Sequence, residues 1–304
     1  EAVNSGEAIL RQGGNAVDAA IAGVLTAFAS EPVLTGPFGG GFAMVASPKA
    51  AAQSYQFFAQ APGIGGSPND EVQDFLGLEC TFGPATQTFH VGKGSVALPL
   101  MLPGLIKLHE DKGSLGWRSL IAPAAEIAQE GILLSEKMAG IFDVLTPILS
   151  LTPGVKALFA PGGKMLKAGE RFSSPDLPMF LSQLGTGNLG ETYGNLLSHF
   201  GSPAGLIQPG DLQGQTIISP PALEFPFGET IIHLNPPPTS GGLLIAFGLH
   251  LLTHVPKAVW KDQAETMRHF LAVMATTQKA RLEYIDNELE KGGSDWLSRI
   301  LTPD

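Results

Sequence analysis

Apolar positions near the N-terminus predict two consecutive helices. The first covers residues 2–12 and ends at Gly13-Gly14, because glycine readily adopts the left-handed backbone conformation that closes a helix. The second covers residues 16–29, and Asn15 with Asp18 has the spacing of a capping box at its start. Since this second helix carries small or apolar residues on every face, we expect protein to surround it.

Strands precede a helical middle third. Short apolar or alternating runs predict strands at residues 42–46, 53–58 and 86–91, the first of them after a glycine-rich turn. Apolar residues at helical spacing then predict helices at residues 105–111, 120–130, 135–145, 178–184 and 190–200.

The last third of the chain mixes both kinds of element. Gly210-Asp211-Leu212 predicts a return to extended structure, and residues 224–234 predict a hairpin that turns at Phe227-Gly228. Helices are predicted at residues 243–252 and 264–290. The long final helix has an apolar side formed by Met267, Leu271, Met274 and Leu282.

This order of elements favours an α+β layered fold over an alternating parallel α/β fold. The predicted strands are too few to cover the helix at residues 16–29 on both sides. We therefore expect further strands, from another chain or from a continuation of this polypeptide, to complete the layers.

The composition indicates a globular chain with few charges. Of its 304 residues, 44% are hydrophobic and 15% are charged, which excludes disorder, and the net charge of −10 excludes nucleic acid as a partner. Cys80 is the only cysteine, and no apolar run approaches the roughly 20 residues that span a bilayer. Two interpretations of the low charge stay open: a large apolar interface with a partner, or a big core with many tight turns.

Several short motifs follow one another along nearly the whole chain. They are Gly13-Gly14-Asn15-Ala16-Val17-Asp18-Ala19-Ala20, Glu31-Pro32, Gly39-Gly40-Gly41-Phe42, Ala61-Pro62, Gly94-Ser95-Val96-Ala97, Pro103-Gly104, Pro236-Pro237-Pro238-Thr239-Ser240-Gly241-Gly242 and residues 280–286. In this order the motifs resemble the large subunit of the γ-glutamyltranspeptidase family.

The resemblance implies a four-layer αββα sandwich of the N-terminal-nucleophile hydrolase type. In this family a precursor cleaves itself, and the threonine freed at the N-terminus of the small subunit is both nucleophile and base. Residues 1–304 are accordingly expected to form a single domain, the large subunit, with no catalytic residue of its own, no metal and no cofactor. The expected partner is the small subunit from the same precursor, in a heterodimer or a dimer of heterodimers.

One departure from the family pattern bears on specificity. Typical members have an arginine four residues before the proline of the Ala-Pro pair, where it binds the substrate's α-carboxylate, and here that position is Phe58. Phenylalanine cannot make the bidentate contact of arginine. We expect Phe57, Phe58 and Gln60 near the substrate, and three functions stay open: γ-glutamyl amide cleavage, an amidase or acylase of other specificity, and an inactive binding paralogue.

Two other polar signals are interpreted as structural. Thr276-Thr277 resembles a cleavage-site pair but falls inside a predicted helix and precedes Gln278, where the family has histidine. His250 and His254 share a helix face but lack the glutamate of a zinc-binding HExxH motif. Glu1 carries no targeting information, so a bacterial cytoplasm and a periplasm are both compatible with the sequence.

Overall fold

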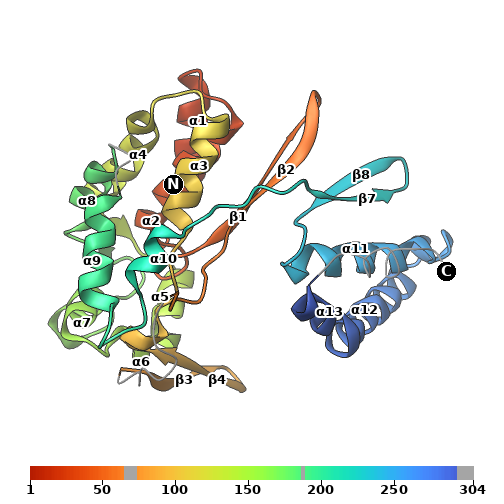
Figure 1. Cartoon of the computed structure of the whole chain (residues 1–304). Helices are drawn as coiled ribbons and strands as arrows, with labels where there is room; N and C mark the ends of the chain where they lie inside the picture. Colours follow the sequence, from red (N-terminus) through yellow and green to blue (C-terminus); the bar gives the residue numbers. More distant parts are fainter. Residues whose placement is uncertain (65–73, 186–188, 293–304) are drawn as a thin grey trace. The chain divides into compact units, whose positions relative to one another are not determined.

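Two compact units make up the protein in the computed structural model, which describes residues 1–64, 74–185 and 189–292 (Figure 1). Unit 1 consists of Glu1–Gly41 and Phe57–Ile217, and unit 2 consists of Phe42–Gln56 and Ile218–Asp304. Both units contain helices and strands, as the α+β prediction requires. The single domain predicted over residues 1–304 stays a prediction.

Unit 1 is mostly helical. Its helices are α1 (Ala2–Arg11), α2 (Ala16–Ser30), α3 (Met101–Lys112), α4 (Trp117–Glu130), α5 (Glu136–Val144), α6 (Thr146–Leu149), α7 (Pro153–Phe159), α8 (Leu177–Leu184), α9 (Gly190–Phe200) and α10 (Pro209–Gln213). Its paired strands are β3 (Leu76–Phe82) with β4 (Ala85–Val91), and β5 (Ile132–Leu133) with β6 (Arg171–Phe172). Short 3-10 turns lie at Lys93–Ser95 and Pro161–Gly163.

The predicted capping box starts α2. Asn15 Oδ1 accepts hydrogen bonds from the backbone N–H groups of Val17 (2.8 Å) and Asp18 (3.0 Å), and Asp18 Oδ2 accepts from Asn15 N–H (2.9 Å). The buried Asp18 carboxylate also accepts from the N–H and hydroxyl of Ser114, in the loop between α3 and α4. One carboxylate therefore starts α2 and ties it to a distant loop.

Helix α2 is buried where it packs against α1 and α4, through residues such as Ile21 and Leu25. Its other face is open, since Ala20 is exposed beside Gly23 and Val24. This chain leaves that face uncovered in the described residues, so the prediction that protein surrounds the helix depends on the further strands expected above and stays a prediction. Small side chains on a helix allow close packing but do not by themselves supply a neighbour.

A cluster of aromatic side chains joins α5, α7 and β6 in unit 1. Phe142 of α5, Phe159 of α7 and Phe172 of β6 are all buried, with ring centroids 5.1 to 6.0 Å apart. Two of these contacts are edge-to-face, an arrangement that aromatic pairs favour.

Unit 2 joins short strands to a helical group. It contains β1 (Gly41–Ser47, whose first residue belongs to unit 1), β2 (Ala50–Phe57, whose last residue belongs to unit 1), β7 (Leu223–Phe227), β8 (Thr230–Leu234), α11 (Ser240–Thr253), α12 (Gln263–Ala280), a π-helical turn (Arg281–Ile285) and α13 (Asp286–Lys291), with a 3-10 turn at Val259–Lys261. Figure 1 shows α11 between the β7–β8 hairpin and α12. The pairing of β7 with β8 confirms the predicted hairpin, and Phe225 and Leu234 of the hairpin pack against Ala246 of α11.

The long final helix is interrupted and its apolar side is uncovered. The predicted helix over residues 264–290 contains the π-helical turn, across which Arg281 Nε contacts Asp286 Oδ2 at 3.2 Å. The side chains predicted on one side of it are 56% to 65% exposed: Met267, Leu271, Met274 and Leu282. Within the described residues, no helix is both long and apolar enough to cross a membrane.

Three segments differ from the predictions. Gly210-Asp211-Leu212 lies in the short helix α10 and is not extended, because Pro209 occupies the first helical position and Asp211 completes a capping box with Gln208. Pro103-Gly104, which precedes the helix predicted at residues 105–111, lies inside α3. Strand β3 was not predicted at all.

Candidate functional site

Three segments of unit 1 meet where β2 ends, and we call this the strand-end junction: Gly39–Gly41, Phe57–Gln60 and Leu98–Met101. The carbonyl of Gly39 accepts hydrogen bonds from the N–H groups of Leu100 (3.1 Å) and Met101 (3.0 Å). A Cβ on Gly40 would lie 2.3 Å from Ala59 N, so only glycine allows the turn to cross the strand end this closely. The glycine run therefore serves close backbone packing.

Phe57 is packed inside the junction. Its side chain is 3% exposed and fills the space above Gly41 and Gly104, where an added Cβ at Gly104 would meet Phe57 Cγ at 2.1 Å. Its burial therefore supports packing between β2 and α3 and offers no face to solvent.

Phe58 and Gln60 lie on the open side of the same segment. Phe58 is 61% exposed, and Gln60 is exposed while its backbone exchanges two hydrogen bonds with Leu98 (3.2 and 2.8 Å). Two of the three predicted site residues are thus exposed, on a backbone fixed by its neighbours, and their contact with a substrate stays a prediction.

Asp211 also belongs to this region, although no sequence pattern singled it out as a site residue. Its buried carboxylate accepts hydrogen bonds from the backbone of Gly63 and Ile64, just after Gln60 in the chain. A pattern search could have found the capping box of α10, but not the contact with a segment almost 150 residues away in sequence.

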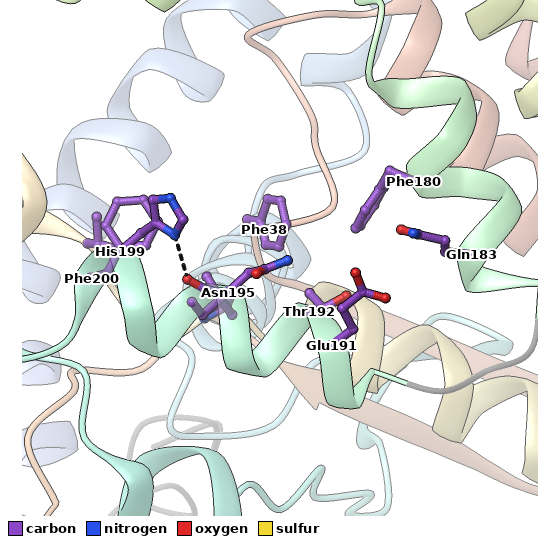
Figure 2. A pocket seen from close by; sticks show the side chains of 11 residues that line it. Phe38, Phe180, Gln183, Glu191, Thr192, Asn195, His199 and Phe200 are labelled. Carbon is purple, nitrogen blue, oxygen red and sulfur yellow. Dashed lines mark hydrogen bonds between the residues drawn. The ribbon is translucent and has the colours of Figure 1, made fainter.

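A cavity of about 410 Å³ lies beside helices α8 and α9 (Figure 2). Apolar side chains and a row of polar side chains form its wall: Phe38, Val96, Pro99, Phe180, Leu196 and Phe200, with Gln183, Glu191, Thr192, Asn195 and His199. In Figure 2 the α9 side chains form the row, and Phe38 lies above its middle.

The cavity adjoins the strand-end junction through the chain. Phe38 directly precedes Gly39 in the chain. Pro99 lies between Leu98 and Leu100, whose N–H groups donate to the carbonyls of Gln60 and Gly39 within the junction. The rings of Phe38 and Phe180 are 5.6 Å apart, and His199 Nδ1 contacts the Asn195 carbonyl at 2.9 Å. This wall suits an apolar group with a polar end. Phe57, Phe58 and Gln60 are not among its lining residues.

The remaining polar signals stand apart from the junction. Thr276 and Thr277 lie within α12, as predicted, with Thr277 Oγ1 directed at Gly248 of α11. His250 and His254 stack edge-to-face with ring centroids 4.9 Å apart. Among the described residues, no three histidine, cysteine, aspartate or glutamate side chains gather as a metal site would require.

Comparison with known proteins decides the family. A family model described as gamma-glutamyltranspeptidase matches residues 2–304. The chain belongs to the γ-glutamyltranspeptidase family. The resemblance that the sequence motifs suggested is therefore confirmed over essentially its whole length.

Relatives within the γ-glutamyltranspeptidase family carry more than one activity in their names. The chain is 27% identical to glutathione hydrolase 2 of Arabidopsis thaliana, over 84% of this chain and 43% of that protein. It is 26% identical to the acylase ACY 1 proenzyme of Pseudomonas sp. (strain V22), over 82% of this chain and 45% of that protein. The chain thus spans about half the length of the curated relatives it matches.

Solved structures show the same fold. The crystal structure of Helicobacter pylori gamma-glutamyltranspeptidase matches with a TM-score of 0.80 at 19% identity, covering 99% of this chain and 86% of that chain. The α+β fold of the γ-glutamyltranspeptidase family is therefore the fold of this protein.

Proposed function

We propose that this chain is the large-subunit part of an N-terminal-nucleophile amidase that works through an acyl-enzyme. A threonine of the small subunit attacks the amide carbonyl, its own α-amine accepts the hydroxyl proton and passes it to the substrate nitrogen, and the C–N bond breaks to release the amine. Water or an acceptor amine then takes the acyl group from the threonine ester. The proenzyme names of the relatives and their greater length support a precursor that supplies both parts.

The small subunit is also the proposed completion of the fold. In the described residues the strands pair as four two-stranded sheets, and small sheets with open faces need covering layers. The exposed apolar side of α12 is a second surface that a partner would bury. A four-layer αββα sandwich formed with the small subunit accounts for both features.

The observation that carries our substrate proposal is Phe58 at the exposed side of the strand-end junction. An aromatic ring at the position of the carboxylate-binding arginine favours an apolar acyl group and gives no compensation for a buried carboxylate. We therefore propose an acylase-like specificity for apolar acyl groups. The relative named acylase ACY 1 proenzyme supports this proposal.

The experiment uses the full-length protein. A denaturing gel of the purified protein is expected to give two bands, and mass spectrometry after brief incubation with an apolar acyl amide should find the acyl mass on the first residue of the smaller fragment. Alanine at that residue is the control and should abolish the adduct. Cleaved protein that carries an acyl group from γ-glutamyl-p-nitroanilide but not from the apolar amide would overturn the apolar specificity, and cleaved protein that carries neither group would overturn the proposal in favour of an inactive binding paralogue.

A further inference from the structure

The side chain of Asp211 is 1% exposed and is surrounded by backbone donors. Oδ1 accepts hydrogen bonds from Gly63 N (3.0 Å) and Ile64 N (2.8 Å), and Oδ2 accepts from Gly63 N (2.9 Å) and Gln208 N (2.7 Å). A buried carboxylate is costly unless such charge-assisted hydrogen bonds surround it. Three N–H groups from two segments therefore depend on one side chain.

Only one of these donors belongs to the capping of α10. Gln208 N–H completes the capping box, whereas Gly63 and Ile64 lie far away in sequence and gain nothing for the helix. The two segments also approach closely, because a Cβ on Gly210 would lie 2.8 Å from the Ile64 carbonyl oxygen. Gly63 has a φ of +118°, a conformation that other residues rarely adopt. The loop after Gln60 is thus shaped to reach Asp211.

The exposed site segment is held on both sides. Gln60 is bound to Leu98 by two backbone hydrogen bonds, and three residues later the chain is bound to Asp211. Gly40 packs closely against the backbone of Ala59, and Asp211 binds the backbone of Gly63. The backbone that carries Phe58 therefore has little freedom to shift.

We propose that Asp211 is a positioning residue that fixes the segment carrying Phe58 and thereby sets the acyl-group preference of the enzyme. The inference rests on the proposed function, in which Phe58 faces the acyl group. Asp211 itself touches no reacting atom. It acts through the backbone of Gly63 and Ile64, and losing its hydrogen bonds lets the site segment move.

The test compares Asp211→Asn with wild type in the mature full-length protein. Asparagine keeps the size of the side chain but replaces one acceptor oxygen with a donor. We measure kcat and KM for hexanoyl-p-nitroanilide and γ-glutamyl-p-nitroanilide, well below the unfolding temperature of each variant. The ratio of kcat/KM for the hexanoyl donor to kcat/KM for the γ-glutamyl donor should fall on the order of tenfold, mainly through KM for the hexanoyl donor, because a misplaced binding group contacts the acyl chain less well.

The matched control is Asp18→Asn, which removes another buried carboxylate that accepts backbone hydrogen bonds in the same unit. It should lower stability without changing the ratio. If Asp211→Asn also lowers stability and leaves the ratio unchanged, Asp211 is merely structural and the inference is overturned.

Hydrogen exchange separates this inference from the proposed function. The amides of Gly63 and Ile64 should exchange faster in Asp211→Asn and at the wild-type rate in Asp18→Asn. If wild type cleaves neither donor, the proposed function and the effect on acyl preference both fail, while faster exchange still supports Asp211 as the residue that positions the segment. Unchanged exchange at both amides overturns that role too.

Discussion

The carboxylate of Asp18 is fully buried, and yet its pKa lies below the ordinary value. Burial by itself raises the pKa, but the hydrogen bonds from the Ser114 hydroxyl and from the N–H groups of Asn15, Ser114 and Leu115 outweigh it. Because the folded pKa is lowered, the stabilisation is present above the unfolded pKa of about 3.9 and is lost as the pH falls through the folded value.

Asp18→Asn should therefore lower the free energy of unfolding by about 2 kcal/mol at neutral pH. It should also flatten the loss of stability on the acid side, because the variant has no carboxylate to protonate. Urea unfolding over a pH series measures both effects. Asp143→Asn, which removes an exposed partner of Lys167, is the control and should change stability by less than about 1 kcal/mol. Equal effects of the two substitutions would contradict this account of Asp18.

Tyr193 gives the opposite pH dependence. Its hydroxyl donates to Gln215 Oε1 (2.6 Å), and burial raises its pKa to about 12. Since the folded pKa is raised, the stabilisation is complete below the unfolded pKa of about 10 and is lost as the pH rises toward the folded value. Tyr193→Phe should reduce the alkaline fall in unfolding free energy, and the tyrosinate absorbance of wild type should include a late-titrating group. If every tyrosine titrates near pH 10, burial does not raise the pKa of Tyr193 and this account of its pH dependence is wrong.

Phe58 is the residue at which specificity is most open to change. Its side chain is 61% exposed, so a substitution there should leave the fold intact. Phe58→Arg should raise kcat/KM for γ-glutamyl-p-nitroanilide relative to hexanoyl-p-nitroanilide by about tenfold, the size of one charge-assisted contact. Phe58→Leu, which stays apolar, is the control. Similar ratios in both variants would remove Phe58 from the acyl site.

At the scale of elements, adjacent glycines in one turn have different tasks. A Cβ on Gly40 would collide with the backbone of Ala59, whereas a Cβ on Gly39 would meet only the Gly36 carbonyl oxygen at 3.5 Å. Gly40→Ala should thus separate the turn from the strand end and lower the free energy of unfolding by about 2 kcal/mol or more. Gly39→Ala should cost about 1 kcal/mol or less. Thermal unfolding of both variants decides, and a reversed order would contradict the described junction.

Local sequence signals predicted those elements whose cause is local. The capping box of α2 and the β7–β8 hairpin follow from a few neighbouring residues and were predicted correctly. Strand β3 was missed because its side chains are mostly exposed, so it has no alternation of buried and open positions. Helix α10 was missed because Gly210-Asp211-Leu212 was predicted to begin extended structure, and the capping box with Gln208 was not considered.

The candidate site was predictable only in part. The glycine run and the Phe58 substitution could be found from spacing in the sequence. The contact of Asp211 with Gly63 and the cavity between Phe38 and α9 join residues more than 140 positions apart, and only the folded chain brings them together.

For the molecule as a whole, the exposed apolar side of α12 indicates where a partner chain is needed. Met274 is 65% exposed within this surface. Met274→Glu should make the chain more soluble when it is expressed by itself, and should weaken its association with the rest of the precursor, because a charge is costly in an apolar interface. Thr276→Glu, at an exposed position on the opposite side of the same helix, is the control. Pull-down of the two tagged parts measures association; if Met274→Glu associates normally, this surface is not the interface.

The central claim is that this enzyme prefers substrates with an apolar acyl group, because Phe58 stands at the position where typical family members have a carboxylate-binding arginine. It is tested most directly by the initial rates of p-nitroaniline release from hexanoyl- and γ-glutamyl-p-nitroanilide by the mature wild-type protein. We predict a higher kcat/KM for the hexanoyl donor. Efficient turnover of the γ-glutamyl donor, with little or none of the hexanoyl donor, would contradict it.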